Sequence, residues 1–286
     1  MNKKERHEVP SYTGIVPLHV LADWNCMRRA LIACIHGNLI ALETVLKDIA
    51  LEGVDEIVCL GDMVGYGPDA LECVDLVRSE CAFSLCGNHD YYLFTDSVIA
   101  IHQILKSGLS RDRKLLQPTW FKGQESKTRW EWIKELKPHV SYGGACLVHG
   151  SIRNPLFEHP SEEDFLLVNG SQGIMAREIF NFDEPICFCA HTHRPGIVAQ
   201  GKEWQRPEAL ESSRASLDSS VKYMVNVGSV GQPRDRDPRS CYVIWDDVDR
   251  TVTFHRIPYD IDAAIKRFQS VEEIGKKHGD RLRLGV

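Results

Sequence analysis

Side chains that bind metals or transfer protons occur at five places in this chain, and each place directly follows a short apolar run. The five places are Cys34-Ile35-His36, Gly61-Asp62, Gly87-Asn88-His89-Asp90, His149-Gly150 and His191-Thr192-His193. Imidazole, carboxylate, amide and thiolate groups are all metal ligands in proteins. Each group taken singly is better explained as a polar turn. Five of them in a row, each after a strand-like run, indicate one shared site.

The apolar runs predict the elements that position these groups. Residues 30–35, 55–60 and 82–86 are typical of buried strands, and helices are predicted from Leu39 to Gly53 and over 68–80, opening at Pro68. This alternation predicts parallel strands joined by right-handed crossovers. Because the carboxyl ends of such strands converge on the ligand crevice of an open sheet, residues far apart in sequence can meet there.

The rest of the chain is also predicted to contain both helices and strands. Residues 92–140 are predicted to be helical, with a polar interruption at 106–122 and an amphipathic run at 126–137. The polar stretch 208–220 is predicted to be a surface loop, and 259–277 a helix. We expect an extension over 1–29 and one domain over 30–286, with the helical insertion around 92–140. Further strands are predicted at 144–149, 185–191, 222–227, 240–246 and 251–257, with a hairpin turn at 247–250.

Composition excludes several classes of protein. The 286 residues are 43% hydrophobic and 26% charged with a formal net charge of −6, which is ordinary for a globular chain and argues against general nucleic-acid binding. No apolar run has the length of a membrane span and no secretory signal opens the chain, so a cytoplasmic location is expected. Most of the ten cysteines lie inside apolar runs, which favours reduced core thiols. Cys187 and Cys189 should share one strand face.

The order of the five polar groups resembles the pattern of the calcineurin-like metallophosphoesterase superfamily, which runs D-x-H, G-D, G-N-H-D/E, a later H, and G-H-x-H. The resemblance extends from about Leu31 to Asp246 and includes "GDMVGYGPDALECVDLVR", "LVHGSIRNPL" and "VNVGSVGQPRDRDPRSCY". These stretches are similar to the bacterial and archaeal phosphodiesterase-like branch. The resemblance implies an α/β fold, a four-layer α/β/β/α sandwich of two packed mixed sheets flanked by helices.

The resemblance also implies a centre of two metal ions. Its first ion takes Cys34, His36, Asp62 and His193, and its second takes Asp62, Asn88, His149 and His191. Asp62 would bridge the ions, and a hydroxide held between them is a strong nucleophile at neutral pH. His89 matches the family histidine that protonates the leaving oxygen or steadies the phosphate, so His89 and Asp62 are the predicted catalytic residues.

Two positions depart from the family pattern. Ala190 replaces the glycine of G-H-x-H, and Cys34 replaces the first aspartate. As a thiolate, Cys34 keeps the negative charge and favours zinc or iron, with manganese possible. As a buried hydrophobe it would leave the first ion weak or absent. As an exposed thiol of low pKa it would be an oxidisable switch. Ligation is the reading we favour.

The substrate is predicted to be a small phosphodiester or a nucleotide. No arginine follows Gly61-Asp62, which disfavours a Ser/Thr protein phosphatase. A dinucleoside-polyphosphate hydrolase, a phosphomonoesterase and, from another class, a catalytically weakened metal-binding regulatory protein remain alternatives. Arginine donates two parallel hydrogen bonds to phosphate. The predicted substrate contacts are Asn38, Arg153, Arg194 and Arg234.

Overall fold

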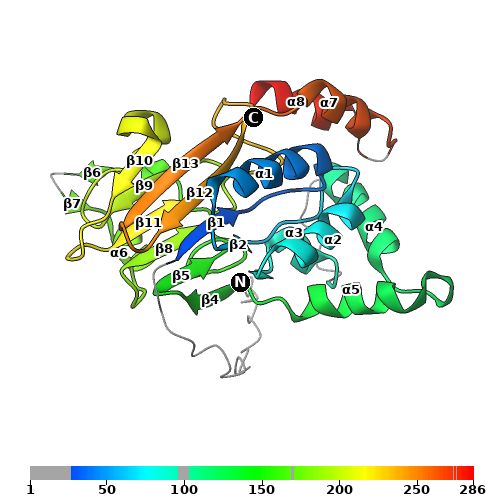
Figure 1. Cartoon of the computed structure of the whole chain (residues 1–286), viewed down its shortest axis with the longest axis horizontal. Helices are drawn as coiled ribbons and strands as arrows, with labels where there is room; N and C mark the ends of the chain where they lie inside the picture. The colour runs from blue at the N-terminus through cyan, green and yellow to red at the C-terminus, as the bar shows by residue number, and fades with distance from the viewer. Residues whose placement is uncertain (1–26, 96–102, 169–170, 273, 275) are drawn as a thin grey trace, which may run out of the picture.

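A six-stranded mixed sheet forms one half of the molecule (Figure 1). The computed structural model describes residues 27–95, 103–168, 171–272, 274 and 276–286. The strands are β1 (Arg28–Ile32), β2 (Glu56–Cys59), β3 (Phe83–Ser84), β10 (Arg214–Ser216), β12 (Ser240–Asp246) and β13 (Thr251–Ile257). Their order is β10-β13-β12-β1-β2-β3. β1, β2 and β3 are parallel, and the other neighbours are antiparallel.

A five-stranded mixed sheet packs against the first. Its strands are β4 (His139–Tyr142), β5 (Ala145–Val148), β8 (Ile186–Cys189), β9 (Gly196–Ala199) and β11 (Tyr223–Asn226), in the order β4-β5-β8-β11-β9. The central three are parallel, and β4 and β9 run antiparallel at the two edges. A separate two-stranded ribbon joins β6 (Leu167–Val168) and β7 (Ser171–Gln172).

Helices cover the outer faces of both sheets. They are α1 (Leu39–Glu52), α2 (Ala70–Glu80), α3 (Asn88–Tyr92), α4 (Gln103–Leu116), α5 (Gly123–Glu135), α6 (Ile174–Ile179), α7 (Ile261–Gln269) and α8 (Lys276–Leu284). The described residues also include the short 3-10 helices η2 (Trp120–Lys122), η3 (Glu162–Phe165), η4 (Pro207–Ala209) and η5 (Glu211–Ser213). Figure 1 shows α1, α7 and α8 over the six-stranded sheet, with α6 on the far side of the five-stranded one.

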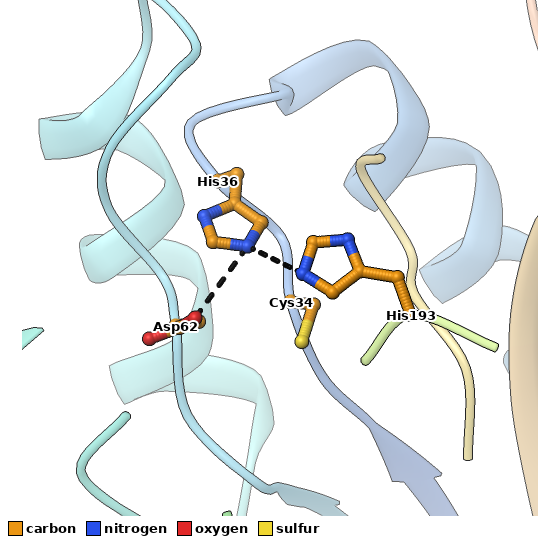
Figure 2. A group of neighbouring side chains, drawn as sticks. All are labelled: Cys34, His36, Asp62 and His193. Carbon is orange, nitrogen blue, oxygen red and sulfur yellow. Dashed lines mark hydrogen bonds and ion pairs between the residues drawn. The ribbon is translucent and has the colours of Figure 1, made fainter. Parts of the chain in front are cut away.

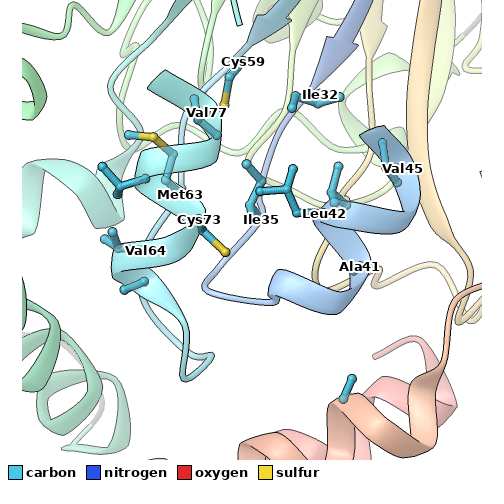
Figure 3. Close-up of a cluster of buried hydrophobic side chains, with 14 of the residues drawn as sticks. Ile32, Ile35, Ala41, Leu42, Val45, Cys59, Met63, Val64, Cys73 and Val77 are labelled. Atoms are coloured by element: carbon cyan, nitrogen blue, oxygen red, sulfur yellow. The ribbon is translucent and has the colours of Figure 1, made fainter. Parts of the chain in front are cut away.

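Three separate hydrophobic clusters fill the interfaces between the four layers. Successive side chains on a strand point to opposite faces of the sheet. Ala30 and Ile32 therefore belong to the cluster with α1 and α2, while Leu31 between them belongs to the cluster that contains Phe188 of the other sheet. Figure 3 shows the first cluster, where Ile32 lies beside side chains of α1 and α2. The third cluster joins the outer face of the five-stranded sheet to α6. The predicted four-layer sandwich is thus confirmed.

Several predicted elements are confirmed with their connections. β12 and β13 occupy the predicted residues and form a hairpin. β1, β2 and β3 are parallel, with α1 and α2 as the crossovers. Gly53 ends α1 in the left-handed conformation, with φ of 64°. Cys187 and Cys189 pack in the same cluster, as alternation on one strand requires.

The start of the chain differs from prediction. β1 begins at Arg28, so the predicted extension over 1–29 reaches too far, and its residues 1–26 lie outside the described part. The strand also ends at Ile32 rather than at residue 35, because Cys34 and His36 both have φ of 51°, which interrupts an extended strand. α2 begins at Ala70, after Pro68.

The predicted helical segment 92–140 is only partly right. α4 runs through most of the predicted polar interruption, because buried Leu109 and Leu116 give the helix an apolar side. His139–Tyr142 is an edge strand instead of a helix. Residues 96–102 lie outside the described part.

The later segments also need correction. The stretch 208–220, predicted to be a loop, contains β10, which pairs with β13 at the sheet edge. The predicted single helix at 259–277 is instead two helices, α7 and α8. β9 was not predicted, because its four residues Gly196–Ala199 are too short to give a periodic signal.

Candidate metal centre

The carboxyl ends of strands from both sheets meet at one place. Cys34 and His36 follow β1, Asp62 follows β2, and His193 follows β8. One donor atom from each of these four buried residues lies within 4.8 Å of the others (Figure 2). A second group, Asp62, His149 and His191, meets the same distance limit. The structure therefore brings the sequence-predicted ligands into two adjoining groups that share Asp62.

The backbone at these residues is strained. A non-glycine residue with positive φ costs about 1–3 kcal/mol, and such strain collects at functional sites. The φ angles lie between 51° and 63° at five of the predicted ligands, namely Cys34, His36, Asp62, His191 and His193.

Two histidines of the first group face each other through ring nitrogens that carry no proton. His36 Nδ1 lies 3.0 Å from the Val64 carbonyl and His193 Nδ1 lies 2.6 Å from the Gln232 carbonyl. A carbonyl only accepts hydrogen bonds, so each neutral ring carries its proton on Nδ1 and leaves Nε2 as a lone pair. The two Nε2 atoms are 3.1 Å apart, and Figure 2 shows them pointing at one another. Two facing lone pairs repel unless a cation lies beside them, so this donor set fits a metal ion.

The second group has the same arrangement at one of its histidines. His149 Nδ1 lies 2.7 Å from the Leu60 carbonyl, so the neutral form of this ring carries its proton on Nδ1 and has a lone pair on Nε2. That Nε2 lies 3.2 Å from His191 Nδ1, 3.3 Å from Asn88 Oδ1 and 3.3 Å from Asp62 Oδ2. His191 Nε2 is buried without a hydrogen-bond partner in the described chain. Oxygen and nitrogen donors converging in this way also fit a divalent ion.

Asp62 lies between the two groups. Its Oδ2 is 3.5 Å from His36 Nε2 and 3.3 Å from His149 Nε2, and its Oδ1 accepts a hydrogen bond from the His89 amide at 2.8 Å. Burial alone would raise the pKa of this carboxyl, but His149 and His89 hold it well below its ordinary value. Asp62 is therefore an anion positioned to bridge two cations.

Glycine is required around Asp62. A Cβ on Gly87 would lie 2.1 Å from Asp62 Oδ1, and a Cβ on Gly61 would lie 2.4 Å from the Gly87 nitrogen. Gly61 also has φ of 92°. The glycines of the Gly61-Asp62 and Gly87-Asn88 pairs thus let two loops approach closely enough for Asp62 and Asn88 to share a site.

Asp90 holds these two loops together, a role that sequence reasoning missed. Its carboxylate is fully buried and accepts hydrogen bonds from the backbone of Asp62 at 2.7 Å, Met63 at 3.0 Å and Gly87 at 3.0 Å. The position of Asp90 in Gly87-Asn88-His89-Asp90 was the only indication of this role in the sequence. The sequence does not show which backbone amides donate hydrogen bonds to the carboxylate. Asp90 positions Asp62 and Asn88 without itself contacting the shared space.

The loop after β11 holds Cys34 and His193 in place through hydrogen bonds. Gly231 donates its amide to the Cys34 carbonyl at 3.1 Å, and the Ser229 hydroxyl donates to the same carbonyl at 2.8 Å. A Cβ on Gly231 would lie 1.8 Å from the Ile35 oxygen. Together with the Gln232 carbonyl that fixes His193, this loop sets the ligand orientation. In the sequence, the only indication of this role was the resemblance of the stretch "VGSVGQPRD" to the family.

Cys34 is completely buried. Burial and the neighbouring Asp62 raise the pKa of its thiol well above the ordinary value, so a thiolate at this position needs a cation beside it. An oxidisable switch requires an exposed thiol of low pKa, and Cys34 has neither property. Cys34 also packs among the residues between the sheets, as a bystander would. Its Sγ belongs to the first donor group, which supports ligation.

The ring of His89 lies beside the first group. Its centroid is 4.5 Å from that of His36 and 4.8 Å from that of Tyr66. Nδ1 is buried, and a Cβ on Gly65 would lie 2.1 Å from it, so Gly65 makes room for the ring. Burial lowers the pKa of His89 to about 4.

Comparison with known proteins places this geometry in a family. The model of the calcineurin-like phosphoesterases matches residues 27–195. The chain belongs to the calcineurin-like phosphoesterase family. It is 32% identical over 259 residues to an uncharacterised protein of Methanocaldococcus jannaschii, covering 90% of this chain and 97% of that one. Membership makes the chain a metal-dependent phosphoester hydrolase.

Solved structures share the fold of this calcineurin-like phosphoesterase. A metallophosphoesterase from Sphaerobacter thermophilus has a TM-score of 0.74 and 32% identity, covering 92% of this chain and all of that one. A hypothetical protein from Pyrococcus horikoshii OT3 has a TM-score of 0.67 at 19% identity, with coverage of 91% and 98%. Among the described residues, no helix has the length and apolar character needed to cross a membrane.

The predicted substrate contacts lie in different environments. Asn38 is buried and caps α1, accepting from the Ala41 amide at 3.2 Å and donating to the Gly231 carbonyl at 2.9 Å. Its amide is therefore engaged inside the protein. Arg153 forms ion pairs with Glu158 at 3.1 Å and Glu178 at 2.5 Å.

Arg234 and Arg194 lie closer to the metal ligands. The Arg234 amide donates to the His193 carbonyl at 3.2 Å, and its guanidinium carbon lies 5.6 Å from the centroid of the Tyr66 ring. Arg194 directly follows His193 and donates from Nε to the Arg234 carbonyl at 3.3 Å. The two arginines thus lie side by side at the edge of the centre.

Proposed function

We propose that this chain is a phosphodiesterase that hydrolyses a small phosphodiester or nucleotide at a centre of two metal ions. The observation that carries the proposal is the pair of adjoining donor groups sharing Asp62, with lone pairs of His36 and His193 facing each other at 3.1 Å. The first ion is assigned to Cys34, His36, Asp62 and His193, and the second to Asp62, Asn88, His149 and His191.

Two ions at these ligands would activate a water molecule and stabilise the charge of the transition state. The residues of the chain then supply orientation. The Val64 and Gln232 carbonyls fix the tautomers of His36 and His193, and Asp90 holds the Asp62 loop. We assign to His89 the contact with the leaving oxygen through its Nε2 edge, because Nδ1 is buried beside Gly65. A neutral ring at this position suits hydrogen bonding to the phosphate.

An aromatic surface beside the second donor group supports a nucleotide substrate. Phe157 is 39% exposed and packs against Tyr91 at 5.9 Å and Tyr92 at 5.8 Å between ring centroids. Both tyrosines directly follow the Asn88-His89-Asp90 stretch, and the ring of His159 lies 3.8 Å from that of His191. Exposed aromatic rings next to a phosphate site suit stacking of a nucleobase.

The experiment compares three chromogenic esters with the same leaving group in the presence of manganese or zinc. They are p-nitrophenyl phosphate, bis-p-nitrophenyl phosphate and the p-nitrophenyl ester of thymidine 5′-monophosphate. We expect kcat/KM to be lowest for the monoester and highest for the nucleoside diester. A preference for the monoester would contradict the phosphodiesterase assignment and favour the phosphomonoesterase alternative.

Substitution of Phe157 tests the nucleotide part separately. Loss of one stacking partner should raise KM for the thymidine ester by roughly 5-fold or more, with little change for bis-p-nitrophenyl phosphate. The matched control is Phe121→Ala on η2, where the side chain is 94% exposed. An equal effect of Phe157→Ala on both diesters would remove the support for a nucleobase contact.

A further inference from the structure

A cavity rich in arginine adjoins the metal centre. Its volume is about 280 Å³, and it is lined by Arg194, Arg206, Arg234, Asp235 and Arg236. Four guanidinium groups and one carboxylate in so small a space give it a net positive charge. Such a cavity attracts anions in a chain whose formal net charge is −6.

The carboxylates around the cavity are already engaged elsewhere. Asp235 is ion-paired with Arg256 behind the cavity. Arg206 is bound by Glu162 through two hydrogen bonds, of 2.7 Å and 3.0 Å. For Arg194, Arg234 and Arg236, no carboxylate lies within 4.0 Å among the residues that the structure describes. These three arginines therefore form no ion pair among the described residues, and the one carboxylate of the lining, Asp235, is held by Arg256.

Arg234 connects this cavity to the metal centre. Its amide bonds to the His193 carbonyl, and its guanidinium lies over Tyr66, whose ring is 4.9 Å from that of His36. The side chain is held in place because Nε and Nη2 donate to Gln232 Oε1 at 3.2 Å and 2.7 Å. A ligand held by Arg234 can thus reach toward the first donor group.

The backbone of Arg236 is also held in place. The Arg236 amide donates to the Gly285 carbonyl at 2.9 Å, and Arg236 has a strained φ of 69°. Guanidinium groups bind phosphate through paired hydrogen bonds.

We propose that the cavity of Arg194, Arg234 and Arg236 binds a second phosphate group of the substrate while the metal centre holds the scissile one. The natural substrate is then a phosphodiester or nucleotide that carries an additional phosphate. This inference rests on the proposed phosphodiesterase function and narrows its substrate class.

The test uses two diesters that differ only in the second phosphate. They are the p-nitrophenyl ester of thymidine 5′-monophosphate and the same compound with a 3′-phosphate. For the metal-loaded wild-type chain we expect kcat/KM to be about 10-fold higher for the bisphosphate, the size of effect that charged hydrogen bonds produce. Arg236→Gln should reduce this ratio to about 2.

Arg239→Gln is the matched control, because Arg239 lies on the same loop, is ion-paired with Asp237 at 2.6 Å and does not line the cavity. It should keep the wild-type ratio. Equal rates on both esters for the wild type would overturn the inference while leaving the phosphodiesterase proposal intact. Failure to hydrolyse either ester would overturn the proposed function itself.

A last arm distinguishes a substrate phosphate from free phosphate. If the cavity holds the substrate, inorganic phosphate should compete with the bisphosphate ester, and Arg236→Gln should weaken that competition. A different result would contradict the proposal. The wild-type chain would then hydrolyse both esters at equal rates, and inorganic phosphate would have a non-competitive effect that depends on Arg236. That result would mean that the cavity is a phosphate site separate from the substrate site.

Discussion

For the two donor groups of the centre, the sequence and the geometry give opposite answers about which group is better suited to hold a metal ion. By ligand type, the group with Cys34 departs from the family pattern and the group with His149 matches it. By geometry, the Cys34 group needs a cation more, because both of its histidines present lone pairs to each other at 3.1 Å. In the other group, His191 Nδ1 can donate a hydrogen bond to His149 Nε2 at 3.2 Å. The need for an ion is therefore set by the tautomers that backbone carbonyls impose, as well as by ligand identity.

Asp62→Asn should have the largest effect, because Asp62 alone belongs to both groups. Replacing a bridging carboxylate by a neutral amide removes the shared negative charge between two cations. We expect loss of both equivalents of metal and of hydrolysis down to the background rate, measured by elemental analysis and a chromogenic diester. The loss of a single equivalent would contradict the bridging role.

The variant Cys34→Ala tests the metal content of the two groups separately. If Cys34 is a ligand, this variant should lose about one equivalent of metal and keep the ion at His149 and His191. Cys34→Asp should keep two equivalents and shift the preference from zinc or iron toward manganese, because carboxylates favour harder ions.

The bystander alternative predicts a different outcome for the same variants. A buried thiol that only packs would leave metal content and metal preference unchanged in Cys34→Ala, with a small loss of thermal stability from the smaller side chain. Cobalt substitution adds a direct readout, since a cysteine ligand gives a sulfur-to-cobalt absorption band. Two retained metals and a cobalt spectrum identical to that of the wild type would exclude ligation by Cys34.

His89→Asn should leave both groups filled and act on turnover alone. His89 contacts the rings of His36 and Tyr66 and is not part of either donor group. We expect kcat to fall by about 10² to 10⁴ at unchanged metal content. Gly65→Ala provides a useful comparison, since a Cβ there would push the ring from its place. A parallel loss of metal in His89→Asn would show that His89 acts as a ligand instead.

The residues that the structure brings together were easier to pick out from the sequence than the elements around them. The residues of both donor groups could be found because each follows an apolar run, which is a local signal. The strand His139–Tyr142 and the edge strand Arg214–Ser216 could not, because each is defined by its pairing with a distant strand. The left-handed backbone of Cys34 and His36 was hidden for a similar reason, since tertiary contacts to the loops after β2 and β11 hold it in place.

The supporting residues were also beyond sequence reasoning. Asp90, Ser229 and Gln232 act through backbone hydrogen bonds across 28 to 195 positions of the chain. The arginine cavity depends on which carboxylates are engaged elsewhere, and Asp235 next to Arg234 is paired with Arg256, more than 20 positions away. Pairing of this kind depends on the fold and has no periodic or motif signature.

The central claim is that two adjoining groups of side chains hold two metal ions that hydrolysis requires. Its most direct test is elemental analysis of wild-type protein purified without added metal, with diesterase activity measured on the same samples during stepwise chelation and re-addition of metal. We expect close to two equivalents per chain, activity that falls as metal is removed, and recovery when it is restored. Full activity in protein stripped of metal would contradict the claim.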